Sequence, residues 1–254
     1  METKEIKLPA QETDVLARIK DVLKARPTYG YRRVTAILNA KRYQVGLENL
    51  NHKRIYRIMK ENGLLLCRYA NKPLRVHDGK IITLHSNTRW CSDGLYITCD
   101  NGERVQVAFS LDTCDRESIS YVASNRGIDS HMICDLMAQS MQYHFGNVNQ
   151  LPHSIQWLTD NGPCYIARKT ITFGRSIGLD ICTTRPYSPE SNGMAEAFVK
   201  TFKRDYVWLG DLSSAERVMQ QLAAWFEDYN QNAPHKGLNM RSPRQYIQER
   251  SLAA

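Results

Sequence analysis

The chain has 254 residues, of which 42% are hydrophobic and 24% charged, so it can bury a sizeable core and is not a disordered protein. No apolar run approaches the roughly 20 residues of a membrane span, and the amino-terminal "METKEIKLPAQETD" lacks the apolar stretch of a secretory signal. The seven cysteines show no CxxC pair and no His/Cys ligand spacing, which indicates reduced thiols in a cytoplasm and disfavours a structural zinc site.

The net charge of +8 is divided unevenly along the chain. Residues 1–89 hold 19 lysines and arginines against 8 aspartates and glutamates, whereas residues 90–254 hold 15 against 18. A basic front segment joined to a slightly acidic body predicts a nucleic-acid-binding module followed by a part with a different task. Membrane lipid is the alternative partner, but the segment lacks a continuous amphipathic helix with a large aromatic face. We therefore expect nucleic acid and no membrane.

Residues 1–65 have the pattern of three short helices. The first is ended by Pro27, and the second is built on apolar positions between residues 34 and 38 and ends before "KRYQVG". The third runs from about Asn51 to near Gly63. Three short helices with a basic outer surface fit a fold of the helix-turn-helix type, although basic solvated faces are also common in proteins without a ligand.

The candidate DNA contacts of this module are its basic side chains, Arg32, Arg33, Lys53, Arg54 and Arg57. The segment 66–89 that follows has basic residues, proline and glycine and little periodicity. We interpret it as a linker that could lie along a phosphate backbone.

From Trp90 onward the pattern changes to strands. "WCSDGLYITCD" alternates, "NG" makes a hairpin turn, "ERVQVAFSLDTCD" is the partner strand, and "SISYVAS" is the third strand. The expected elements after these are a helix at 130–145, a strand "SIQWLTD", a helix from "NGPCY" through Ile177, a strand "LDICTT", a helix starting at Ser188 and a second amphipathic helix at 214–230. This order predicts a mixed sheet covered by helices, with three antiparallel strands extended by parallel ones.

Three carboxylates occupy matching positions in these elements. Asp93 shares the apolar phase of the first strand, where a carboxylate must be paired, neutralised or bound to a cation. Asp160 lies just past the carboxyl end of "SIQWL", where open α/β sheets place ligand sites. Glu196 is on the helix after the fifth strand. If the first and fourth strands are neighbours, all three acids converge at one edge of the sheet.

Each acid also has a structural explanation. "TDNG" around Asp160 is a sequence typical of a turn. Asp93, an aspartate in a strand, can be a hydrogen-bonded core residue. Glu196 with Lys200 forms an i,i+4 ion pair worth about 0.2–0.5 kcal/mol. With 26 acids in the chain, such triples also arise by chance. Beside a basic module, however, three hard oxygen ligands suit Mg²⁺, and two such ions can act on both oxygens of a phosphodiester.

At this point the residues resemble a known family. "WCSDG", "LTDNGPCY" and "RPYSPESNGMAEAFVKTFKRD" resemble the DDE motif of retroviral integrases and bacterial insertion-sequence transposases, with 35 residues between Asp160 and Glu196 and Lys203 seven beyond the glutamate. "YGYRRV" and "KRIYRIMKENGLL" are similar to the helical DNA-binding segment in the OrfB part of IS-three family transposases. "YNQNAPHKGLNMRSPRQYI" matches that family's carboxyl-terminal pattern, and "RWCSDG" and "CDNGER" resemble its insertion-sequence-two subgroup.

The resemblance implies an RNase H-like core at residues 90–254, with a carboxyl-terminal helix and tail, behind a helical module and a basic linker. It implies that Asp93, Asp160 and Glu196 hold Mg²⁺ or Mn²⁺, with two ions expected, and that Lys203, Lys200 and Asn161 contact DNA. The implied reaction cleaves DNA at transposon ends and transfers the 3′-OH strand to a target.

The implied partners are double-stranded DNA of the transposon ends and target, further copies of the chain, and a protein or fusion from an upstream reading frame. The implied location is the nucleoid in a bacterial cytoplasm. Two alternatives stay open: an RNase H-like nuclease or resolvase that cuts without joining, and a DNA-binding regulator with a vestigial core.

Overall fold

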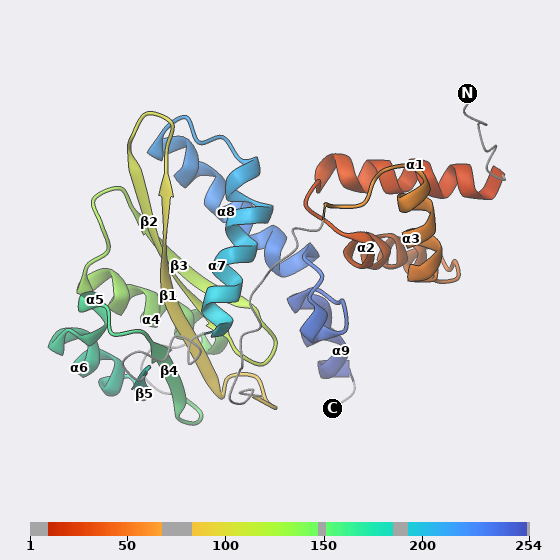
Figure 1. Ribbon diagram of the computed structural model, residues 1–254. Coiled ribbons are helices and arrows are strands. Elements are labelled where there is room, and N and C mark those ends of the chain that lie inside the picture. The colour runs from red at the N-terminus through yellow and green to blue at the C-terminus, as the bar shows by residue number, and fades with distance from the viewer. Residues whose placement is uncertain (1–9, 68–82, 147–150, 185–192, 253–254) are drawn as a thin grey trace. The chain divides into compact units, whose positions relative to one another are not determined.

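The computed structural model describes residues 10–67, 83–146, 151–184 and 193–252 (Figure 1). It divides the chain into two compact units, Met1–Leu74 with Asn232–Ser242, and Arg75–Gln231 with Pro243–Ala254. Most of the predicted linker at 66–89 lies outside the described residues, as does the predicted helix start at Ser188. The course of the linker and the boundaries at 65 and 89 therefore stay predictions.

The first unit contains the three expected helices, α1 (Ala10–Ala25), α2 (Tyr31–Gln44) and α3 (His52–Glu61). Asn51 caps α3, because its side chain accepts a hydrogen bond from the main-chain N–H of Lys53 at 2.9 Å. The predicted end of α2 before "KRYQVG" was wrong by about one turn. The helix continues because its last turn carries basic residues, which the negative end of a helix dipole favours.

The core of this unit lies between the apolar faces of the three helices. Asn39 of α2 also ties the segment before α3 to the unit, since its side chain both donates to the carbonyl of Leu50 and accepts from the N–H of Leu50. The buried apolar residues are Val15, Ile19, Val22, Tyr29, Val34, Leu38, Leu50, Ile55, Ile58 and Met59. The apolar positions between residues 34 and 38 that indicated the second helix thus include Val34 and Leu38 of this core.

The second unit is built on a five-stranded sheet of order β3-β2-β1-β4-β5. The strands are β1 (Arg89–Thr98), β2 (Arg104–Asp112), β3 (Ser118–Ser124), β4 (Ile155–Thr159) and β5 (Leu179–Thr183). β1, β2 and β3 pair antiparallel, while β4 is parallel to both β1 and β5. This confirms the predicted mixed sheet. The first and fourth strands are neighbours, which is the condition under which the acids were expected to converge.

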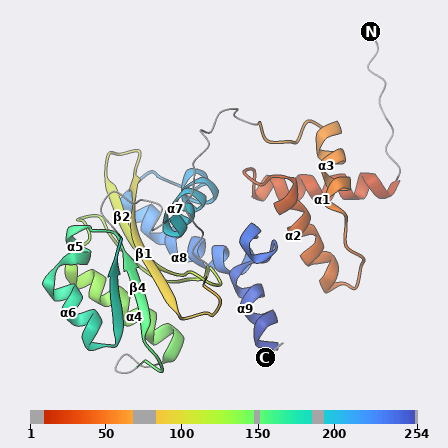
Figure 2. The same cartoon turned by 60° about the horizontal axis from the view of Figure 1, so that its bottom comes forward.

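Helices cover both faces of the sheet, as Figures 1 and 2 show. One face carries α4 (Ser130–Phe145), α5 (Pro163–Ile166) and α6 (Arg168–Ser176), and the other carries α7 (Gly193–Asp205) and α8 (Ala215–Asn232). The chain also forms short 3₁₀ turns, η2 (Val207–Leu209) and η3 (Lys236–Leu238), and a last helix, α9 (Pro243–Leu252). No described helix is long and apolar enough to cross a membrane.

One further difference from the predicted elements concerns the helix after "NGPCY". The single helix expected after "NGPCY" is broken into α5 and α6, because Ala167 between them is extended, with φ −56° and ψ 136°. Gly174 of α6 lies so close to β5 that an added Cβ would be 2.5 Å from a side-chain carbon of Ile181. The break therefore accompanies a close approach of α6 to the sheet.

The core on the α4 side is centred on two tryptophans. Trp90 of β1 and Trp157 of β4 are cross-strand partners, fully buried, with ring centroids 6.4 Å apart in an edge-to-face arrangement. Leu136, Met137 and Met141 of α4 are fully buried in the same cluster. This packing fixes β4 against β1, and with it the edge at which the acids lie.

Candidate active site

The pairing of β1 with β4 places the first two acids side by side. The parallel partners are Arg89–Gln156, Trp90–Trp157 and Cys91–Leu158, a constant offset along both strands. The same offset puts Asp93 level with Asp160, which directly follows the last residue of β4. This register brings Asp93 and Asp160 together at the carboxyl end of β4, while the convergence of all three acids stays a prediction.

Asp93 is only partly exposed, and its Oδ1 accepts a hydrogen bond of 2.7 Å from the N–H of Gly94. Burial raises the pKa of Asp93 from 3.8 to about 6, and the Gly94 N–H opposes this change. The charges of Asp160 and Glu196 raise the pKa further. Asp160 and Glu196 thus each lie within electrostatic reach of Asp93.

Asp160 lies in the turn that the sequence indicated. Its Oδ1 accepts from the N–H of Gly162 at 2.9 Å, while the side-chain amide of Asn161 donates to the carbonyl of Thr184 at 3.0 Å. Asn161, expected to contact DNA, thus uses an amide hydrogen to tie this turn to the end of β5. Asp160 itself is exposed, so the turn leaves its carboxylate accessible.

Glu196 is positioned by aromatic packing of α7. Phe198, two residues further on, is buried, and the centroid of its ring is 4.4 Å from the ring centroid of Phe109. Phe109 belongs to β2 and is the cross-strand partner of Asp93. Ala195 is fully buried beside it. The first turn of α7 is therefore docked over the strand pair that carries Asp93.

The lysines of α7 differ in their surroundings. Lys200 forms the expected ion pair with Glu196, with Nζ and Oε2 3.3 Å apart and the lysine side chain 70% exposed. Such an exposed pair contributes only a few tenths of a kcal/mol and does not prevent other roles of the carboxylate. Lys203 is half-buried, two turns beyond Glu196 on the same helix.

The sequence reasoning missed one polar contact beside these acids. Ser92 donates to the hydroxyl of Tyr165 at 3.1 Å, and both residues are buried. Ser92 precedes Asp93, and Tyr165 follows Asp160 by five residues. The only sequence signal was a serine inside a strand among apolar residues, which by itself names no partner.

In the first unit, the predicted DNA contacts divide into packed and exposed side chains. Arg33 lies 3.6 Å above the ring centroid of Tyr29, a cation–π contact, and its side chain therefore belongs partly to the core packing. Arg32, Lys53 and Arg57 are exposed, and Arg54 is half-buried. Their roles in DNA binding stay predictions.

The metal-binding capacity of the acids depends on charge and donor type. Within the described ranges, no three His, Cys, Asp or Glu side chains are gathered tightly enough to hold one ion between them. Asp160 and Glu196 nevertheless each repel the ionised carboxylate of Asp93, and hard carboxylate oxygens are the donors that Mg²⁺ and Mn²⁺ prefer. The donor set therefore fits a divalent cation, whose charge would offset the repulsion and favour closer approach.

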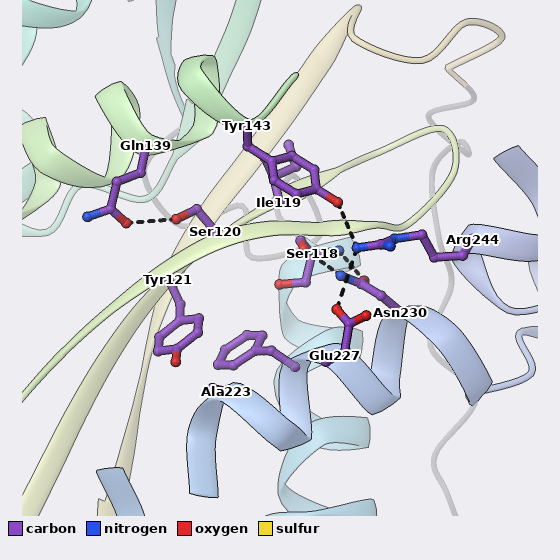
Figure 3. A pocket seen from close by; sticks show the side chains of 11 residues that line it. Ser118, Ile119, Ser120, Tyr121, Gln139, Tyr143, Ala223, Glu227, Asn230 and Arg244 are labelled. Carbon is purple, nitrogen blue, oxygen red and sulfur yellow. Dashed lines mark hydrogen bonds and ion pairs between the residues drawn. The ribbon is translucent and has the colours of Figure 1, made fainter. Parts of the chain in front are cut away.

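A cavity of about 400 Å³ lies elsewhere in the second unit, between β3, α4 and α8 (Figure 3). Arg244 of α9 reaches it and donates to the hydroxyl of Tyr143 at 2.8 Å (Figure 3). Its Nε also donates to Glu117 at 3.0 Å. These bonds hold α9 in place. The three acids do not line this cavity.

The fold and the acids together define a class of protein, an integrase-type catalytic core of RNase H-like fold preceded by a helical module. The integrase core domain family matches residues 84–189 and 177–243, and the HTH-like (helix-turn-helix-like) domain family matches residues 10–73. The simian T-cell lymphotropic virus intasome contains a chain of similar fold, 18% identical with a TM-score of 0.54, covering 90% of this chain and 73% of that one.

Sequence relatives narrow the class to a family. The chain is 46% identical over 243 residues to transposase InsD for insertion element IS2A/D/F/H/I/K of Escherichia coli, covering 94% of this chain and 80% of that protein. The identity is the same to InsD of IS2-9 from Escherichia coli strain K12, of which 78% is covered. The chain belongs to the IS2-type InsD transposases of the IS3 (IS-three) family, which are DDE transposases.

Proposed function

We propose that Asp93, Asp160 and Glu196 are the catalytic acids of this transposase and that together they hold two Mg²⁺ or Mn²⁺ ions. The family establishes that the chain is an enzyme of transposition. The observation that supports this residue assignment is the register of β1 and β4, which puts Asp93 level with Asp160, together with the raised pKa of Asp93 beside both other acids.

The proposed reaction has two steps on phosphodiesters. In the first, a water oxygen attacks phosphorus at the transposon end and the bond to the 3′ oxygen breaks, which leaves a 3′-OH. In the second, this 3′-OH attacks a target phosphodiester, so a new P–O3′ bond forms and a target 3′-OH leaves. The bound ions would lower the pKa of the attacking oxygen and stabilise the leaving oxygen. Lys203 and Lys200 would orient the phosphate.

The partners follow from the same chemistry. Transposase and integrase relatives act on DNA, and we assign duplex binding in the first unit to Arg32, Arg33, Lys53, Arg54 and Arg57. Each chain carries one acid triad, whereas a transposon has two ends, so we propose a homo-oligomer on DNA in the nucleoid. A protein or fusion from an upstream reading frame is a further proposed partner.

The test of the acid assignment is Glu196→Gln. The change keeps size and helix propensity and gives up only an exposed ion pair, so melting should hardly change. A carboxamide is a poorer Mg²⁺ ligand than a carboxylate, and cleavage of transposon-end DNA should fall at least about 10³-fold, with duplex binding unchanged or slightly tighter. Glu216→Gln, in the first turn of α8, is the matched control and should cleave normally. Near-normal cleavage by Glu196→Gln would remove Glu196 from the site.

Labelled transposon ends also separate the two alternatives. A nuclease or resolvase would give cleaved ends and no joined product, whereas a transposase gives both. A regulator with a vestigial core would bind the ends and give neither product in Mg²⁺ or Mn²⁺. The similarity to InsD transposases over most of the chain favours joining.

A further inference from the structure

The main-chain pairing between β1 and β4 ends before it reaches the acids. Its last pair among the described residues is Cys91–Leu158, two residues short of Asp93 and Asp160. Something other than the sheet ladder must therefore set the separation of the two carboxylates. The Ser92–Tyr165 hydrogen bond joins the segments that carry the two acids beyond this last pair, so it can set their separation.

Ser92 and Tyr165 connect the two acid-bearing segments beyond that last pair. Ser92 is the neighbour of Asp93 in β1 and points to the opposite face of the sheet, because side chains alternate along a strand. There it donates to the hydroxyl of Tyr165 in α5, at 3.1 Å. Ser92 has no exposed surface and Tyr165 is 5% exposed, so water does not compete for this bond.

Tyr165 is in turn fixed to the segment that holds Asp160. Its N–H donates to the carbonyl of Gly162 at 2.9 Å, and its ring packs in the core with Trp157 and Met137. A Cβ added to Gly162 would lie 3.0 Å from Oδ1 of Asp160 and 3.3 Å from the Tyr165 ring. The turn, its carboxylate and the ring are packed without spare room, so a displacement of Tyr165 moves the turn.

We propose that Ser92 and Tyr165 are positioning residues whose hydrogen bond sets the distance between Asp93 and Asp160 for metal binding. The inference rests on the proposed function, in which both acids are metal ligands. A directional bond between buried hydroxyls fixes a separation more narrowly than apolar contact does. Groups that orient metal ligands in this way typically change metal affinity about 10–100-fold when removed.

The experiment measures Mn²⁺ binding to the full chain without DNA, by the electron paramagnetic resonance signal of free Mn²⁺. Tyr165→Phe and Ser92→Ala should each raise the Mn²⁺ dissociation constant about 10-fold. The Mg²⁺ concentration for half-maximal cleavage should rise by a similar factor, with a smaller change in kcat at saturating Mg²⁺. Tyr229→Phe is the matched control, since its buried hydroxyl donates to a carbonyl, that of Arg116, at 3.2 Å. It should bind Mn²⁺ normally.

The double variant Ser92→Ala with Tyr165→Phe separates two effects of the hydrogen bond. One is its contribution to stability, since it gives each buried hydroxyl a partner, and the other is its effect on the distance between the acids. Each single variant leaves one hydroxyl without its partner and should melt lower, whereas the double variant removes both hydroxyls and should melt closer to wild type. A positioning role predicts that its Mn²⁺ binding stays about 10-fold weaker. Should the double variant regain wild-type Mn²⁺ affinity together with stability, the proposal is overturned. If a single variant does not fold, the double variant carries the test.

Asp93→Asn, measured in parallel, separates this inference from the proposed function. Unchanged Mn²⁺ binding in Asp93→Asn overturns the metal-ligand assignment itself. Weakened binding in Asp93→Asn with normal binding in Tyr165→Phe overturns only the positioning role.

Discussion

Replacing Asp93 by asparagine should stabilise the metal-free protein at neutral pH. In the folded protein the pKa of Asp93 is raised to about 6, against an ordinary value of 3.8, with burial as the main cause. A raised pKa means that the carboxyl contributes stability at pH below 3.8 and loses it as the pH rises through about 6. Above that pH the folded protein carries the cost of an ionised, partly buried acid, whereas asparagine does not ionise.

The size of this effect follows from the same two pKa values. One pKa unit is worth about 1.4 kcal/mol, so the gain in the free energy of unfolding has an upper limit of about 3 kcal/mol at pH 7.5. At pH 5 the folded carboxyl is mostly protonated while the unfolded one is ionised, and about half of the gain should remain. The Gly94 N–H can still bond to the asparagine oxygen, so the substitution sacrifices no contact.

The assay is unfolding in urea with a chelator present, followed by tryptophan fluorescence at pH 7.5 and at pH 5. All four tryptophans lie between residues 90 and 225, so the signal reports the catalytic core. Adding Mg²⁺ should reduce or reverse the advantage of the variant, because only the wild type keeps all three carboxylate ligands. Equal destabilisation of the variant at both pH values would refute the reasoning. It would show that Asp93 acts as a hydrogen-bonded core residue and not as an acid whose ionised form is destabilised by burial.

Three further predictions concern the helices that carry the site and the DNA contacts. Phe198→Ala should lower the free energy of unfolding by about 3–5 kcal/mol and reduce cleavage, because its buried ring docks α7; normal cleavage with the full loss of stability would show that Glu196 does not depend on this docking. Lys203→Ala should weaken strand joining more than duplex binding, with Lys203→Arg partly active, and joining assays in which alanine equals wild type would exclude Lys203 from the site. Replacing residues 53, 54 and 57 together by alanine should reduce the slope of log K against log salt concentration for duplex binding by about 2–3, because each lost phosphate contact removes about 0.9. The binding constants come from fluorescence anisotropy, and an unchanged slope would place the contacts elsewhere.

Several elements were predictable because their signals are local. Strand alternation, the "NG" hairpin turn and the helical period of 130–145 lie within short windows, and β3 and α4 have the predicted bounds. Other bounds were set by context. α2 runs one turn longer than predicted. α9, which was expected only as an unspecified carboxyl-terminal helix, is held by the contacts of Arg244 with Glu117 and Tyr143.

The sequence by itself determined the family and the order of the strands along the chain, and it singled out the three candidate acids, because these depend on residue identity and on short-range periodicity. Only the tertiary structure decided that β4 lies beside β1 in a register that puts Asp93 level with Asp160. It also decided the raised pKa of Asp93 and the Ser92–Tyr165 contact, which joins residues 73 positions apart. These properties arise from burial and from charges on distant segments, and they exist only once the packing of Trp90 on Trp157 has brought the strands together.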